Sequence, residues 1–139
     1  MKGRKPRIIP LDRTPDGEPI EGLPVEPPSE LDERARGEWL RIIPLLEGVA
    51  TARDIALLIC RCKLWSEWKT AQDHIDQHGQ LVVSPNGYEM PNPSLSIARQ
   101  AVDRIHKIDM EFGLTPLGRT RLKQPKPKPV ENKKAKFFA

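Results

Sequence analysis

Residues 51–79, TARDIALLICRCKLWSEWKTAQDHIDQHG, decide the fold of this chain. Thr51 and Asp54 have the spacing of a capping box, and Gly79 is a typical residue just beyond a helix end. No proline or glycine interrupts the stretch between them, so the sequence predicts one long helix.

The apolar residues of this helix follow two lines instead of one stripe. Ile55, Leu58, Ile59, Cys62, Trp65 and Lys69 follow the first line, and Leu57, Leu64, Trp68, Ala71 and Ile75 follow the second. A helix that is apolar on two sides needs two covers. We expect one cover from the same chain and the other from a neighbouring subunit, with Leu57, Leu64, Trp68 and Ile75 as the subunit interface.

Shorter elements flank the long helix. A helix is predicted to begin near Ser29, and Pro44 should kink or end it. After Gly79, the turn Pro85-Asn86-Gly87 predicts a small β-hairpin over residues 80–91. Asn92-Pro93 then opens a third helix that Gly113 ends, and Thr115-Pro116 is suited to start one more short helix. The predicted fold is mainly α: a three-helix protomer with a long central helix and a small hairpin.

The charge is divided between the ends and the body. Residues 1–7 carry four cations and no acid, and residues 119–139 carry eight cations and one acid, so with a net charge of +4 the middle must be −7. We predict a proline-rich basic arm over 1–28, a helical core domain over 29–118 and a basic tail over 119–139, with both arms disordered in isolation. About 90 residues bury only a small core, which favours oligomerisation.

Basic arms of this kind are typical of proteins that bind a polyanion, and nucleic acid is the first candidate. A solubilising tail without a specific partner is the alternative. The predicted DNA-binding residues are Lys2, Arg4, Lys5, Arg7, Arg53, Arg119, Arg121, Lys123, Lys126, Lys128, Lys133, Lys134 and Lys136. Phe137 and Phe138 end the tail and suggest a motif that docks on a partner protein, although a fortuitous tail end is an equal alternative.

No catalytic constellation is visible in the sequence. There is no phosphate-binding glycine loop and no nucleophile near a base, and the carboxylates Asp109 and Glu111 fall on exposed-looking helical positions. His74 and His78 lie four residues apart, but zinc would need further ligands. We therefore predict no catalytic residue, no metal and no cofactor. Cys60 and Cys62 fit reduced apolar positions and a cytoplasmic setting.

Trp39, Trp65 and Trp68 lie within helical apolar patterns, which favours core or subunit packing over base stacking. The chain shows neither a signal peptide nor a membrane span.

The order of several motifs resembles one family of phage terminase small subunits. These motifs are Gly3-Arg4-Lys5-Pro6, a helix with Trp39, then Asp54, Cys60, Trp65 and Gly79, Pro85-Asn86-Gly87, Pro91-Asn92-Pro93, and Glu111-Phe112-Gly113-Leu114-Thr115-Pro116 followed by Arg119 and Arg121. The resemblance implies a non-enzymatic protein of the host cytoplasm that forms a homo-oligomeric ring. It also implies binding to double-stranded viral DNA at the packaging site, and recruitment and regulation of the large ATPase and nuclease subunit.

Two other classes of function remain open from the sequence. One is a small helical DNA-binding transcriptional regulator that acts as a dimer, and the other is a zinc enzyme built on His74 and His78. Many small terminases resemble helix-turn-helix proteins at their N-terminal ends, and this chain departs from that pattern because its leader is proline-rich.

Overall fold

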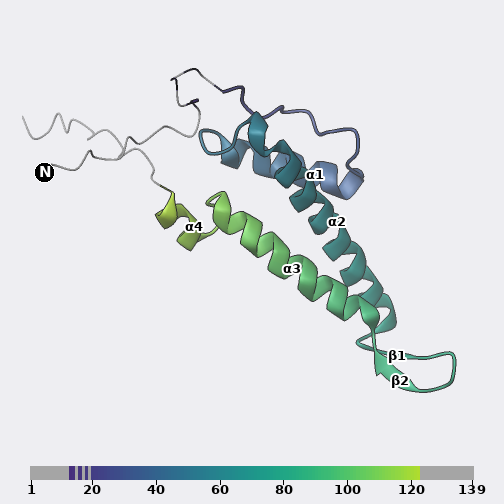
Figure 1. Ribbon diagram of the computed structural model, residues 1–139. Helices are drawn as coiled ribbons and strands as arrows, with labels where there is room; N and C mark the ends of the chain where they lie inside the picture. Colours follow the sequence, from purple (N-terminus) through teal and green to yellow (C-terminus); the bar gives the residue numbers. More distant parts are fainter. Residues whose placement is uncertain (1–12, 15, 17, 19, 123–139) are drawn as a thin grey trace, which may run out of the picture.

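The computed structural model describes residues 13–122 except 15, 17 and 19. Its helices are α1 (Glu33–Ile42), α2 (Ile55–His78), α3 (Pro93–Glu111) and α4 (Pro116–Arg121), and two 3₁₀ turns, η1 (Ile43–Leu46) and η2 (Ala52–Asp54), lie between α1 and α2. Strands β1 (Leu81–Val83) and β2 (Glu89–Pro91) form an antiparallel hairpin. The mainly helical fold class with three principal helices and a hairpin is confirmed (Figure 1).

Helix α1 begins later than the sequence pattern suggested. Asp32 caps it by accepting a 2.8 Å hydrogen bond from the Ala35 backbone N–H, so the helix starts at Glu33 and not near Ser29. The expected effect of Pro44 is confirmed, because the α-helix ends at Ile42 and the chain continues as the 3₁₀ turn η1.

The long helix has the predicted ends. The Thr51 backbone N–H donates to the Asp54 carboxylate over 2.9 Å, and the Thr51 hydroxyl accepts from the Arg53 N–H, which completes the capping box. The first turn is 3₁₀ (η2), and α2 then runs unbroken to His78, where Gly79 takes a φ of +81°.

The core lies where α1 crosses the first half of α2. Its buried residues are Leu31, Ala35, Trp39, Ile42 and Leu46 around α1, Ala50, Leu58 and Cys62 around α2, and Phe112 after α3. The leader takes part as well: Leu23 packs against this cluster, and the Trp39 Nε1–H donates to the Pro24 carbonyl oxygen over 3.3 Å. Residues 21–24 of the predicted arm are therefore held against the body, in contrast to the expected disorder.

Helix α3 runs antiparallel to α2 along most of its length (Figure 1). The buried Ala98, Ala101 and Ile105 bring the two helices close together. Asn92 caps α3 by accepting from the Ser94 N–H over 3.0 Å, and its side-chain amide donates to the Gly79 carbonyl oxygen over 2.9 Å. None of the described helices is both long and apolar enough to cross a membrane.

Candidate nucleic-acid interface

Three of the predicted DNA-binding residues, Arg53, Arg119 and Arg121, belong to the described part of the chain, and all three are exposed. The remaining ten lie outside the described residues: Lys2, Arg4, Lys5, Arg7, Lys123, Lys126, Lys128, Lys133, Lys134 and Lys136. Phe137 and Phe138 also lie outside the described residues. The structure therefore places Arg53, Arg119 and Arg121, and it shows the described residues that lead toward the two basic segments.

The leader contacts the body next to Arg53, at Glu21. Arg53 belongs to η2, which the capping box of Thr51 and Asp54 holds in place. The neighbouring Ala52 N–H donates a 2.8 Å hydrogen bond to the Glu21 carbonyl oxygen of the leader. This bond fixes the leader beside the start of the long helix.

The C-terminal tail leaves from α4, which is tightly docked on the end of α3. Gly113 takes a φ of +69° and reverses the chain after α3, and Thr115 caps α4 by accepting from the Gly118 N–H over 3.0 Å. Gly118 packs so closely that a Cβ atom there would lie 2.5 Å from the Met110 carbonyl oxygen. Arg119 and Arg121 project from this anchored turn.

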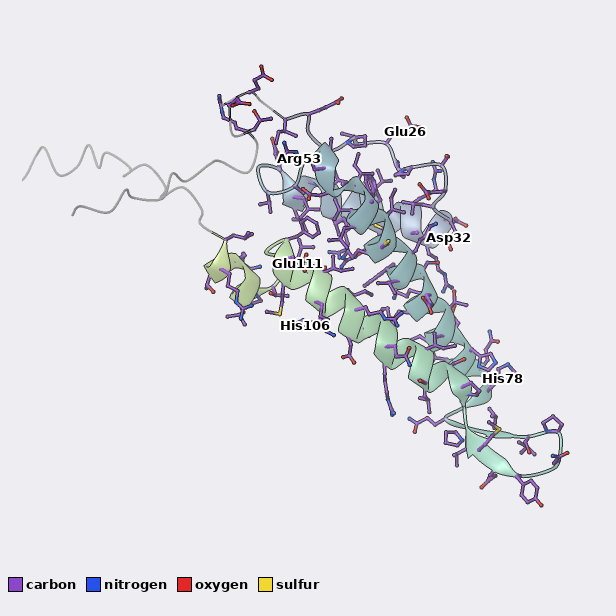
Figure 2. All side chains as sticks on the ribbon, viewed as in Figure 1. Glu26, Asp32, Arg53, His78, His106 and Glu111 are labelled. Atoms are coloured by element: carbon purple, nitrogen blue, oxygen red, sulfur yellow. The ribbon has the colours of Figure 1, made fainter. Side chains whose placement is uncertain are left out.

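The two attachment points lie at the same end of the molecule. A hollow of about 310 Å³ is lined by Thr51, Arg53 and Asp54 on one side and by Glu111, Phe112 and Leu122 on the other. Leu122 is the last described residue before the tail. Figure 2 shows Arg53 and Glu111 at this end, far from His78 beside the hairpin. The fold thus brings Glu21 of the leader and Leu122, which precedes the tail, to the neighbourhood of Arg53.

The body itself is acidic. The described residues carry 13 Lys and Arg against 17 Asp and Glu, whereas the rest of the chain carries 10 against 2. Acidic residues such as Asp54 and Glu111 lie among the arginines at this end. The net positive charge of the protein therefore comes from the sequence outside the described residues.

A buried network of ion pairs joins α1, α2 and α3. It was not predicted from the sequence. Arg61 of α2 is buried and donates to Glu38 of α1 through Nη1 and to Asp109 of α3 through Nε, the latter over 2.7 Å. Arg41 adds a bond to Glu38 over 2.6 Å. The sequence does hold an indication of this burial. Arg61 is a cation whose neighbours three and four residues away, on the same side of the helix, are the apolar residues Leu57, Leu58, Leu64 and Trp65.

This network sets the charge state of its members. Burial opposes ionisation of Glu38, but hydrogen bonds from Arg41 and Arg61 outweigh it and lower the pKa of the Glu38 carboxyl. Burial likewise disfavours the Arg61 cation, yet its bonds to Asp109 and Glu38 raise the pKa of the guanidinium. The exposed position expected for Asp109 is wrong, because Asp109 is half-buried against Arg61.

The predicted interface residues of α2 have mixed environments. Leu57 is exposed, while Leu64, Trp68 and Ile75 are half-buried, and Trp68 lines a hollow shared with Ala98 and Val102 of α3. Trp65 and Trp68 lie with their ring centroids 5.2 Å apart, and the Lys69 ammonium lies 5.2 and 4.9 Å from the two centroids. Trp39 is fully buried, as its place in the helical pattern predicted. The subunit-interface role of Leu57, Leu64, Trp68 and Ile75 stays a prediction.

The cysteine and histidine side chains considered for reactivity or metal binding make structural contacts. Burial raises the pKa of the Cys62 thiol to about 12, so it is an inert core residue. The His74 ring packs on His78 at 4.4 Å between centroids and meets the Asn92 amide and the Ser94 hydroxyl through Nδ1. Within residues 13–122, leaving aside 15, 17 and 19, no three His, Cys, Asp or Glu side chains gather as a possible metal site.

Comparison with known proteins gives one match. A family model described as "phage terminase, small subunit" matches residues 35–129, which is more than half of the chain. No curated protein and no solved structure matches significantly. The match covers most of α1, all of α2, both strands, α3, α4 and the start of the tail. It confirms the resemblance drawn from the order of the sequence motifs. The chain therefore belongs to the phage terminase small subunit family, whose members are not enzymes.

Proposed function

We propose that this protein binds double-stranded viral DNA at the packaging site through its two basic segments and presents that DNA to the large terminase subunit. We further propose that it regulates the ATPase and nuclease of that subunit, and that it works as a homo-oligomeric ring in the host cytoplasm. Family membership supports DNA and the large subunit as partners.

The observation that carries the DNA proposal is that Glu21 of the leader and Leu122, the last described residue before the tail, lie at one end of the body. Glu21 and Leu122, next to Ala52 and Arg53, mark where the arms attach. Ten of the 23 cations belong to the segments 1–7 and 123–136. Lysine and arginine clusters neutralise phosphates and release counterions, which favours binding to a duplex. One end of each protomer would then carry the excess of positive charge, because the described residues hold 13 cations against 17 acids.

Contacts of this type position DNA without reading its bases. A ring would multiply the weak attraction of each pair of arms by avidity, because all arms share one rigid support. Arg53, Arg119 and Arg121 add cations of fixed position at the same end. We propose that choice of the packaging site depends on DNA shape or on a contact other than the lysine-rich tail.

A charge-matched comparison tests the tail. One variant replaces Lys123, Lys126 and Lys128 by Gln, and its control replaces Lys63, Arg99 and Arg104, which are exposed on the body. We expect the tail variant to bind duplex DNA more weakly and to flatten the slope of log affinity against log salt by up to about 3. Equal losses in both variants would mean that only net charge matters and would refute the tail as the DNA arm.

Assembly and partner docking are tested separately. Light scattering on the full chain should give a mass well above a dimer, and a dimer would favour the regulator over the ring. For docking, Phe137→Ala with Phe138→Ala should weaken capture of the large subunit and its ATPase response while leaving DNA affinity unchanged. Unchanged capture would remove the two phenylalanines from the proposed partner contact.

A further inference from the structure

The β-hairpin exposes apolar side chains that no other described part of the chain covers. Leu81, Val83 and Tyr88 are 58%, 68% and 73% exposed. Leu81 and Val83 project from one face of the ladder and Tyr88 and Met90 from the other, because side chains alternate along a strand. Figure 1 shows the hairpin projecting beyond the ends of α2 and α3.

The hairpin is firmly attached at its base despite this exposure. The Asn92 N–H donates to the Gln80 carbonyl oxygen over 2.7 Å, and the buried Asn92 amide donates to the Gly79 carbonyl oxygen over 2.9 Å. These bonds fix the direction in which the hairpin leaves the helices. A two-stranded hairpin is only marginally stable in water, so a fixed and apolar one is suited to insertion into a partner.

The charge of the hairpin restricts the chemistry of that partner. Residues 79–91 contain Glu89 as their single charged residue and no lysine or arginine. A β-ribbon that bound DNA would need cations for the phosphates. The hairpin therefore fits an apolar protein surface and not a nucleic acid.

A matching surface lies at the opposite end of the same chain. A hollow of about 400 Å³ opens between the leader and the α1–η1 segment, with Leu23, Val25, Leu40, Ile43 and Leu46 in its wall. Val25 and Leu40 are exposed at its mouth. Of the ten described residues that line it, Glu47 alone is charged. Helix α1, whose residues wall the hollow, and the hairpin lie at opposite ends of the molecule (Figure 1), so one chain cannot fill its own hollow with its own hairpin.

We propose that the hairpin of one copy inserts into the leader–α1 hollow of the next copy. Every chain carries one projection and one cavity of similar apolar character, so a head-to-tail contact covers both in equal numbers. Such a heterologous contact generates a closed ring when its rotation closes. The proposal rests on the homo-oligomer proposed above and assigns the segments that meet.

Complementation between two variants tests this contact. The hairpin variant carries Val83→Asp and Tyr88→Asp, and the hollow variant carries Val25→Asp and Leu40→Asp. All four positions are exposed, so both protomers should fold with wild-type helical circular dichroism. We expect each variant alone to fall to the 15.8 kDa monomer in light scattering. An equimolar mixture should form dimers, because one intact hairpin and one intact hollow remain.

Other outcomes overturn the proposal. A hairpin variant that keeps the wild-type mass would assign the hairpin to another protein and leave the homo-oligomer standing. Monomers in the mixture would mean that the hairpin of one copy does not enter the hollow of the next, and a hollow variant that still associates by itself would mean that hairpins pair with each other. If truncation after Leu122 abolished assembly, the tail and not the hairpin would be the segment that binds in the hollow of the next copy. Loss of assembly in the control Ile97→Asp with Leu117→Asp, two exposed sites elsewhere, would show that added charge alone is sufficient. A monomeric wild type would instead refute the proposed ring itself.

Discussion

The two ends of the α2–α3 pair are stabilised in opposite ways. At one end, Arg61 joins Glu38 and Asp109 inside a core built around Trp39, and α1, α2 and α3 all contribute. At the other end, the hairpin is attached by the bonds of Asn92 and its apolar side chains face solvent. The difference shows that the buried charges and the core that stabilise the protomer lie at one end, whereas the apolar side chains of the other end are exposed and add little to that stability.

The largest effect is expected from Arg61→Met. This substitution leaves Glu38 and Asp109 without their shared cation in a buried site, which should lower the free energy of unfolding by about 3–5 kcal/mol. Urea unfolding followed by circular dichroism measures it. The control is Lys63→Met, which removes an exposed 3.6 Å ion pair with Glu30 and should cost less than about 1 kcal/mol.

The same site offers a sharper version of this test. Replacing all three members, with Glu38→Met, Arg61→Leu and Asp109→Leu, removes every buried charge of the network and should recover most of the stability lost in Arg61→Met. A triple variant as unstable as the single one would mean that the helices need the ion network for their packing.

Acid should unfold the Arg61 end. The pKa of Glu38 in the folded protein lies below its usual value of 4.5, so its contribution to stability is present above pH 4.5 and is lost as the pH falls through the folded pKa. The pKa of Asp32 is also lowered, chiefly by the Ser66 hydroxyl and then by the Ala35 N–H, and acts in the same direction below its usual 3.8. Thermal melts between pH 7 and pH 2.5 should show the decline.

Glu38→Gln sharpens the pH test. It should lower stability at pH 7 by about 1.5–3 kcal/mol, because Arg61 and Arg41 lose bonds to a charged partner, and it should flatten the decline below pH 4.5. Glu33→Gln, an exposed site in the same helix, should leave the pH curve unchanged. Parallel curves for Glu38→Gln and the wild type would contradict the assignment.

A pair of glycine substitutions separates docked from free helical surface. Gly118→Ala places a Cβ atom against the Met110 backbone and should lower stability by about 1–3 kcal/mol, since α4 must move off α3. Gly37→Ala in α1 meets nothing within 4 Å and should raise stability by about 0.5–1 kcal/mol, because alanine favours the helix. Melting temperatures that shift in the same direction would show that α4 is not held as described.

The smallest effect on the protomer is expected at the hairpin. Tyr88→Ser removes an exposed ring and should change the unfolding free energy of the protomer by less than about 0.5 kcal/mol. The variant should be measured in dilute protein, where assembly does not add to stability. A loss as large as that of Arg61→Met would mean that the hairpin belongs to the protomer core, and the division between the two ends would fail.

Features that depend on neighbouring residues were predictable from the sequence. The capping box of Thr51 and Asp54, the end of α2 at Gly79, the cap of α3 at Asn92 and the start of α4 after Thr115 were all correctly predicted. Each depends on bonds within about four residues or on a glycine conformation. The family was also visible in the order of these motifs.

The partners of groups far apart in the chain could be identified only from the folded structure. Arg61 finds Glu38 and Asp109, which lie 23 and 48 residues away, and Pro24 accepts from Trp39 across the α1 surface. The meeting of Glu21, Arg53 and Leu122 at one end is of the same kind. Helical periodicity tells which side chains share a face, but which face meets which is fixed by packing of the whole chain.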